Sequence, residues 1–300
     1  MPLLITDSGL GGLSLLGRLT VELESIRIGK PEMGMNIIYV NAVPRDKYGY
    51  NDMDSREERI KVFNGLLEQV EQRFDPKQIY VACGSLSALL NQIPFVLKHP
   101  EKVEGIDKIG HKLLNEAMQR NPSAPVYVFA TPTTVSEGLY NISRIFKRNK
   151  PSVYIEQPCP GLASMISSDL EKKVVQDEVF ECCKQALACS ESALHQNPNE
   201  GPIVFLGCTH FSFRSDCFKE AFAELGFPEI SLLDPVPEAA NKLIQEHRLQ
   251  KQEGGIQIQF ISPYRLPELE QKTISALLNQ ISPQTAQAFL NGSVLPGLVL

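Results

Sequence analysis

Two cysteines lie at the carboxyl ends of short apolar segments, about 125 residues apart in the chain. The two sequences are IYVA at 79–82 before Cys83-Gly84-Ser85, and IVFLG at 203–207 before Cys208-Thr209-His210. Open α/β sheets place ligands at the carboxyl ends of buried strands. The N-terminus of a following helix carries free N–H groups and a partial positive charge, which favour a thiolate. The pattern therefore predicts a pair of thiol acid/base groups, one in each half of the protein.

A glycine-containing segment, DSGLGGLS at 7–14, follows the first apolar run. It does not match a dinucleotide-binding loop, because Ser14 stands where the third glycine is required. The glycines still allow backbone N–H groups to approach an anion at a helix start. Asp7 is then a candidate carboxylate of a site, and the alternative is that Asp7 or Ser8 caps the helix.

The remaining thiols and histidines give weaker signals. His210 lies two residues after Cys208 and is placed to tune or assist that thiol. Zinc binding by Cys83 and Cys208 is an alternative, but no C-x-x-C pair accompanies them. Cys159 follows an apolar run and could line a cavity. Packing positions within a long helical pattern are expected for Cys182, Cys183 and Cys189.

The bulk composition is that of a folded, acidic protein. The chain has 300 residues, enough for two ordinary domains, and 43% of them are hydrophobic. A net charge of −6 argues against a nucleic-acid partner. No apolar run approaches the ~20 residues of a membrane helix. Seven irregularly spaced cysteines and an N-terminal segment without basic residues indicate a cytoplasmic protein with reduced thiols.

Short apolar runs alternate with stretches of helical periodicity along the chain. Strands are predicted at 3–6, 36–40, 78–81, 126–130, 153–155, 203–206, 230–233 and 256–261. Helices are predicted at 13–24, 55–74, 108–120, 170–195 and 237–249. Such alternation indicates parallel βαβ units, and the recurring strand-to-cysteine element suggests two similar α/β halves. Surface connections are expected at 94–105 and 196–202, and an irregular tail at 291–300.

Taken together, these segments resemble the aspartate/glutamate racemase superfamily, and glutamate racemase in particular. The matching stretches run in order over about residues 3–240. They are 7–14, Lys47-Tyr48-Gly49, 83–88, 131–140, Cys159-Pro160, 206–210, and Asp234 before a helix.

The resemblance implies two open, mostly parallel-sheet α/β domains that face each other across an active-site cleft. The first would be discontinuous, 1–97 plus 212–300, and the second would be 98–211. It also implies a racemase that needs no cofactor or metal. Its substrate would be a free amino acid, and its product D-glutamate would serve bacterial peptidoglycan. A homodimer is compatible with the sequence, which does not fix the oligomeric state.

The resemblance also assigns roles to individual residues. Cys83 and Cys208 would exchange the acid and base roles according to the bound enantiomer, with Asp7 and His210 assisting them. Substrate contacts would come from Ser8, Tyr48, Gly49, Gly84, Ser85 and Thr209.

This chain departs from the glutamate racemase pattern at four positions. Gly84 and Ser85 stand where asparagine and threonine are usual, Lys47 replaces a proline, and Ser167 replaces a glutamate. The first of these removes an amide that would contact the substrate. Two alternatives therefore stay open: a related enzyme acting on another small carboxylate, and a catalytically silent relative that binds a ligand or a partner protein.

Overall fold

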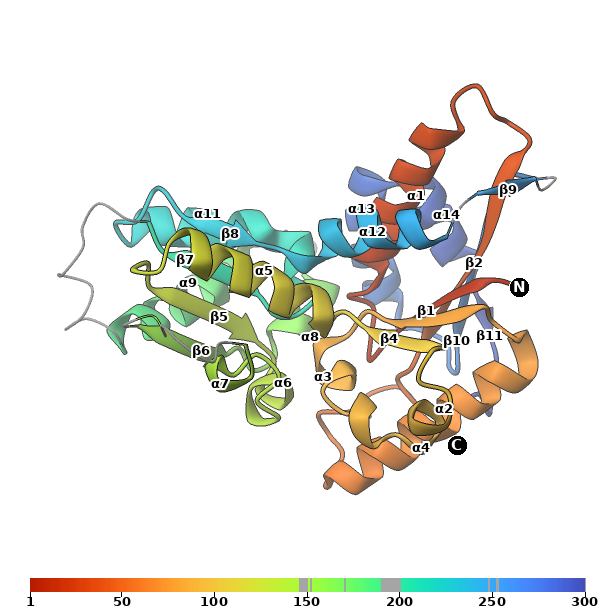
Figure 1. Cartoon of the computed structure of the whole chain (residues 1–300), viewed down its shortest axis with the longest axis horizontal. Coiled ribbons are helices and arrows are strands. Elements are labelled where there is room, and N and C mark those ends of the chain that lie inside the picture. The colour runs from red at the N-terminus through yellow and green to blue at the C-terminus, as the bar shows by residue number, and fades with distance from the viewer. Residues whose placement is uncertain are drawn as a thin grey trace. The chain divides into compact units, whose positions relative to one another are not determined.

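The computed structural model describes residues 1–145, 151, 153–169, 171–189, 201–247, 249–251 and 254–299. The chain divides into two compact units, Met1–Ile106 with Val236–Leu300, and Asp107–Pro235 (Figure 1). Each unit is built on a sheet of mainly parallel strands with helices packed on it. The predicted α/β class with two mostly parallel sheets is therefore confirmed. None of the described helices is long and apolar enough to cross a membrane.

In the described part of the first unit, a seven-stranded sheet has the order β11-β10-β2-β1-β3-β4, and β9 pairs with β2. The strands are β1 (Leu3–Asp7), β2 (Met33–Asn41), β3 (Gln78–Val81), β4 (Val103–Gly105), β9 (Gln250–Lys251), β10 (Ile256–Ser262) and β11 (Ser293–Val294). Their pairing is parallel, except at β9. The register aligns Thr6 of β1 with Val81 of β3. Asp7, the last residue of β1, and Cys83, two residues after the end of β3, therefore lie at adjacent strand ends.

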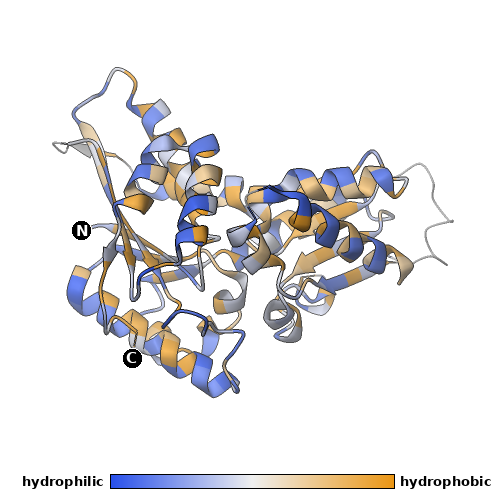
Figure 2. Ribbon diagram, turned by 180° about the vertical axis from the view of Figure 1, so that it is seen from behind, coloured by the Kyte–Doolittle hydropathy of each residue, from blue (hydrophilic) through white to orange (hydrophobic). Residues whose placement is uncertain are grey.

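Helices cover both faces of this sheet (Figure 1). They are α1 (Leu13–Arg27), α2 (Arg56–Phe74), α3 (Gly84–Ser87), α4 (Pro94–Lys98), α12 (Pro235–Glu246), α13 (Glu268–Ile281) and α14 (Pro283–Leu290). Helix α1 packs with α13 and α14. Helix α2 buries Phe63, Leu67 and Val70 against apolar residues of the central strands. The hydropathy colouring shows these apolar strands beside helices of mixed polarity, as amphipathic packing requires (Figure 2).

The second unit has a four-stranded parallel sheet of order β6-β5-β7-β8. Its strands are β5 (Val126–Ala130), β6 (Tyr154–Pro158), β7 (Ile203–Leu206) and β8 (Ser231–Leu233). Its helices are α5 (Asp107–Arg120), α6 (Pro132–Ser136), α7 (Ile142–Ile145), α8 (Leu162–Ser168), α9 (Lys173–Ala188) and α11 (Ser215–Glu224), with a 3₁₀ turn at Phe211–Arg214. Phe129 of β5 packs edge-on against Phe218 and Phe222 of α11, which fixes that helix on the sheet.

The predicted strands all overlap observed ones, but two predicted loop regions contain regular structure. Helix α4 and strand β4 lie within 94–105, and β11 lies in the C-terminal tail. These elements span two to five residues, too few for a hydrophobic period to stand out. The predicted helix 170–195 corresponds to α9, and its last part, 190–195, lies outside the described residues, as do residues 196–200.

The predicted domain boundaries and the two compact units differ at two stretches. Residues 98–106 go with the first unit, because β4 pairs with β3 there. Residues 212–235 go with the second unit, because β8 pairs with β7. In both cases the pairing of a three-residue strand decides the assignment.

Candidate active site

Cys83 lies directly beyond β3 and caps the N-terminus of α3. Its Sγ atom accepts a hydrogen bond from the Leu86 amide at 3.5 Å and lies 2.9 Å from Ser8 Oγ. The side chain is 6% exposed. Ser8 reaches it because β1 and β3 are neighbours with aligned ends. The sheet thus brings together two predicted site residues that are 75 positions apart in the sequence.

Asp7 ends β1 and is buried beside the same thiol. Helix α1 begins after Gly12, and no side chain caps it, so the capping alternative for Asp7 and Ser8 is wrong. A Cβ atom at Gly12 would lie 2.9 Å from Ala82 Cβ and 3.0 Å from Asp7 Oδ2. Glycine is therefore required here because the helix start passes close to the carboxylate and to the residue before Cys83.

The electrostatic environment of Cys83 favours the thiol form. Burial and the neighbouring Asp7 carboxylate raise the pKa of Cys83 to about 11, while hydrogen bonds from Ser8 and the Leu86 amide act in the opposite direction. The sequence predicts that a helix N-terminus favours a thiolate at Cys83, whereas burial and Asp7 hold the pKa of Cys83 well above neutral pH. The helix that Cys83 caps has four residues, so its dipole contributes little against the desolvation of the charged sulfur.

The other predicted residues of the first unit lie in α3 and in the loop after β2. Gly84 and Ser85 form the first turn of α3, and both are buried. Tyr48 donates a hydrogen bond to Glu58 Oε1 at 2.8 Å, and the Gly49 amide donates to Asp52 Oδ2 at 2.8 Å. These hydrogen bonds lie within their own loop and reach the start of α2, while the ring of Tyr48 packs against the apolar cluster that contains Cys83.

Two of the departures from the glutamate racemase pattern have visible structural consequences. Lys47 has a φ angle of 56°, which proline cannot adopt, so the loop backbone here needs a residue other than proline. Ser167 lies in α8, and its hydroxyl donates to the carbonyl of Ala163 at 3.3 Å. It thus replaces a charged side chain by a small group that bonds within its own helix.

Cys208 occupies the corresponding position in the second unit, beyond β7. The amide of Gly207 donates to the Phe129 carbonyl at 2.7 Å, and a Cβ at Gly207 would lie 2.9 Å from Ala130 Cβ. The cysteine Sγ lies 3.8 Å from Nδ1 of His210. Burial lowers the pKa of His210 to about 4, so the imidazole is neutral at pH 7 and has a free nitrogen lone pair. Thr209, between them, is 3% exposed.

Further polar groups line the carboxyl ends of the neighbouring strands in this unit. Thr131 follows β5 and shares a hydrogen bond with Thr134 at 2.9 Å between hydroxyl oxygens. Cys159 follows β6, and its free thiol forms a hydrogen bond with the thiol of Cys182 in α9. That contact, together with burial, raises the pKa of Cys159 well above its usual value, and the charge of a Cys208 thiolate raises it further. The pairing of Cys159 with Cys182 was not predicted, because it joins a strand end to a helix.

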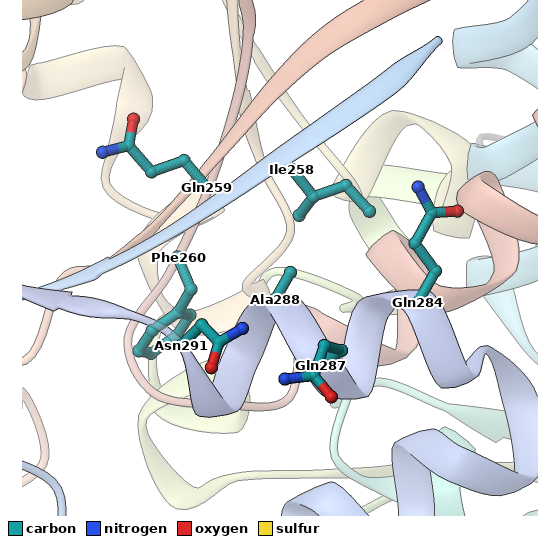
Figure 3. Close-up of a pocket in the computed structure, with 7 residues that line it drawn as sticks. All are labelled: Ile258, Gln259, Phe260, Gln284, Gln287, Ala288 and Asn291. Carbon is teal, nitrogen blue, oxygen red and sulfur yellow. The ribbon is translucent and has the colours of Figure 1, made fainter. Parts of the chain in front are cut away.

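Among the described residues, no group of three or more His, Cys, Asp and Glu side chains is placed to hold a metal ion. A separate cavity in the first unit lies between β10 and α14 (Figure 3). The amides of Gln259, Gln284 and Gln287 point in different directions there, so it has no convergent polar set.

Comparison with known proteins connects these features to a family. No family model matches the chain. Glutamate racemase 3 of Caldanaerobacter subterraneus subsp. tengcongensis is 27% identical over 265 residues, covering 86% of this chain and 84% of that protein. Glutamate racemase of Carboxydothermus hydrogenoformans is 26% identical over 263 residues, covering 85% and 84%. This chain is similar in sequence to glutamate racemases over most of its length. The predicted resemblance is confirmed.

Solved glutamate racemases share the fold of this chain. The Francisella tularensis enzyme, crystallised with D-glutamate, superposes with a TM-score of 0.66 at 22% identity, covering 94% of each chain. The RacE1 isoform of Bacillus anthracis gives a TM-score of 0.65 at 18% identity, covering 100% of this chain and 98% of its own. The predicted class of enzyme, an isomerase of the racemase type, is supported by the relatives found by sequence.

Proposed function

We propose that this chain is a cofactor-independent amino-acid racemase that uses Cys83 and Cys208 as its acid/base pair, with glutamate as substrate. One observation carries the proposal. A relative of the glutamate racemases has a buried thiol at the end of a parallel strand in each of its two units, and each thiol has a potential assistant beside it. Asp7 and Ser8 accompany Cys83, and His210 accompanies Cys208.

Racemisation requires a base on one face of the α-carbon and an acid on the other. The thiolate of one cysteine takes the α-proton and becomes a thiol. The thiol of the other cysteine gives its proton to the opposite face and becomes a thiolate. The substrate loses no electrons, and the two cysteines have exchanged protonation states. Ser8, Tyr48, Gly49, Gly84, Ser85 and Thr209 are the proposed substrate contacts, with the N–H groups near Gly9 and Gly84 facing the charge that develops on the α-carboxylate.

The pKa values suggest how the two roles are divided before the first turnover. Cys83 is a thiol near pH 7 because its pKa is about 11, so it is ready to act as the acid. Cys208 is then the cysteine that acts as the base, and the neutral imidazole of His210 lies 3.8 Å from its sulfur. After one turnover the roles are reversed, which suits the opposite enantiomer.

Deuterium exchange tests this proposal directly. The purified chain is incubated with single enantiomers of a panel of amino acids in D₂O, and deuterium at Cα is measured together with inversion of configuration. Cys83→Ala and Cys208→Ala should each abolish inversion of both enantiomers, while exchange of one enantiomer can persist through the remaining thiol. Cys217→Ala, which removes a buried thiol of α11, is the matched control and should leave turnover unchanged.

Near-normal inversion in either Cys83→Ala or Cys208→Ala would refute the two-thiol mechanism. A second candidate, racemisation of another small carboxylate, is favoured by Gly84 and Ser85 and would appear as exchange with a panel member other than glutamate. An absence of exchange with every substrate would support a silent, ligand-binding relative. With glutamate as substrate, the product D-glutamate would serve bacterial peptidoglycan.

A further inference from the structure

Tyr50 has a buried hydroxyl group without a hydrogen-bond partner in the described part of the chain. The residue is 2% exposed, and its ring packs edge-on against Phe63 of α2, with ring centroids 6.2 Å apart. Two nearby tyrosines differ in this respect, because Tyr39 donates to the Gly9 carbonyl at 2.9 Å and Tyr48 donates to Glu58. A buried polar group that makes no hydrogen bond destabilises the fold, so a state in which Tyr50 acquires a partner would offset this cost.

Cys83 belongs to the same buried cluster as Tyr50, together with Met53, Phe63 and Leu86. Most of this cluster is aliphatic or aromatic, so the Cys83 thiol is one of its few polar groups. Burial raises the pKa of Tyr50 well above its usual value, and a negative charge on Cys83 raises it further. The hydroxyl therefore keeps its proton when the thiolate forms, and it can act as a donor at that moment.

We propose that Tyr50 is a positioning residue for Cys83, whose hydroxyl donates a hydrogen bond to the Cys83 sulfur when the cysteine is a thiolate. A thiol is a weak acceptor, whereas a charged sulfur attracts O–H and N–H donors strongly. While Cys83 is a thiol, it offers the Tyr50 hydroxyl only a weak acceptor, which accounts for the unpaired hydroxyl. The hydrogen bond forms when Cys83 has given its proton to the substrate, and it lowers the cost of holding charge in an apolar layer.

Other groups act on Cys83 from the elements around it. The Asp7 carboxylate at the end of β1 opposes the thiolate. Ser8 Oγ and the Leu86 amide already contact Sγ and favour the thiolate. From β2, the phenol of Tyr39 interacts with both Asp7 and Cys83, but its hydroxyl is engaged by Gly9. Removing the Tyr50 hydroxyl should therefore shift the titration of Cys83 without removing its existing contacts.

The test is Tyr50→Phe in the full chain, which removes the hydroxyl and keeps the ring that packs on Phe63. The rate of Cys83 alkylation by iodoacetamide is measured between pH 8 and 11 by peptide mass spectrometry. We expect the apparent pKa of Cys83 to rise by about one unit, which is about a tenfold slower reaction at a given pH below it. Alkylation of Cys208 in the same samples is the internal control and should be unchanged. Met53→Leu alters the packing of the same cluster and should leave the pH dependence of Cys83 alkylation unchanged.

An unchanged alkylation profile in Tyr50→Phe would overturn the inference, as would an equal shift in Met53→Leu, because packing alone would then be responsible. The role of Tyr50 in turnover rests on the proposed function. In Tyr50→Phe, the apparent pKa in the pH profile of kcat should rise for the direction in which Cys83 acts as the base. The alkylation measurement needs no turnover. A shifted profile in a protein that racemises nothing would keep the inference and remove the proposed function.

Discussion

At the scale of single residues, burial acts in opposite directions on the two candidate acid/base groups. It raises the pKa of Cys83, whose charged form is an anion, and lowers the pKa of His210, whose charged form is a cation. Both groups are therefore neutral at pH 7. In the proposed reaction, charge develops on the cysteines when the α-proton is transferred.

The lowered pKa of His210 predicts a loss of stability in acid. The folded-state pKa of about 4 lies below the unfolded value of about 6.5, so the unfolded chain binds more protons between these values. The stability therefore falls as the pH drops from about 6.5 to about 4, by up to about 3 kcal/mol from this residue. Urea denaturation of the native protein and of His210→Asn at pH 7 and pH 4.5 measures the effect. The variant should lose less stability than the native protein, and an equal loss in both would contradict the prediction.

At the scale of elements, the short helix α3 fixes the backbone conformation of the residues after Cys83. Cys83 has an extended backbone, φ −111° and ψ 127°, and Gly84 begins the helix. Among the described glycines, those with positive φ do not include Gly84. An asparagine with a side-chain amide can therefore replace it without backbone strain.

Gly84→Asn combined with Ser85→Thr restores the usual glutamate racemase sequence after the first cysteine. Because the native chain lacks that amide, we expect weak glutamate turnover that the double variant increases. A neutral hydrogen bond contributes about 0.5–1.5 kcal/mol, so kcat/KM for glutamate should rise by about 2- to 13-fold relative to other amino acids. The kinetics of the panel measure this ratio. Efficient native turnover of glutamate that falls in the variant, with the fold intact, would show that Gly84 is adapted to glutamate.

The start of α1 gives a second prediction at this scale. In Gly12→Ala, the new Cβ would lie 2.9 Å from Ala82 Cβ and 3.0 Å from Asp7 Oδ2, so α1 or the strand ends must shift, at a cost of about 1–3 kcal/mol. Gly65→Ala, within α2, is the matched control because no atom lies within 4 Å of its Cβ. It should stabilise the protein by about 0.5–1 kcal/mol. Chemical denaturation measures the free energy of unfolding of both variants. Equal changes in this free energy would contradict the steric explanation.

At the scale of the whole molecule, the proposed reaction needs residues from two separately built units. Each unit supplies one thiol, and a one-unit fragment would hold half of the proposed acid/base pair. Because one carbon must be reached from opposite faces, we expect the two sulfurs to be about 7 Å apart in a substrate complex, given approach distances of about 3–3.5 Å on each side. A crystal structure with a bound amino acid measures this distance. Sulfurs on opposite surfaces of the molecule would end the racemase proposal.

Much of the fold could be predicted because its signals are local. Apolar runs of four or five residues identified β1, β2, β3, β5 and β7, and the cysteines just beyond β3 and β7 identified the two candidate sites. The short strands β4 and β11 were missed, since their two or three residues carry no period. Leu298, in the tail that was expected to be irregular, is fully buried in the core of the first unit, a contact that depends on the completed sheet.

The sequence by itself determined which residue types stand at strand ends, because chain position and strand periodicity are properties of neighbouring residues. The tertiary structure decided their chemistry. It brought Ser8 to 2.9 Å from Cys83, placed the Asp7 charge beside that thiol, and left the Tyr50 hydroxyl unpaired in the same apolar cluster. A pKa depends on burial and on charges within a few ångströms, and residues far apart in the sequence set both. For this reason the expected thiolate at Cys83 is a thiol in the folded protein.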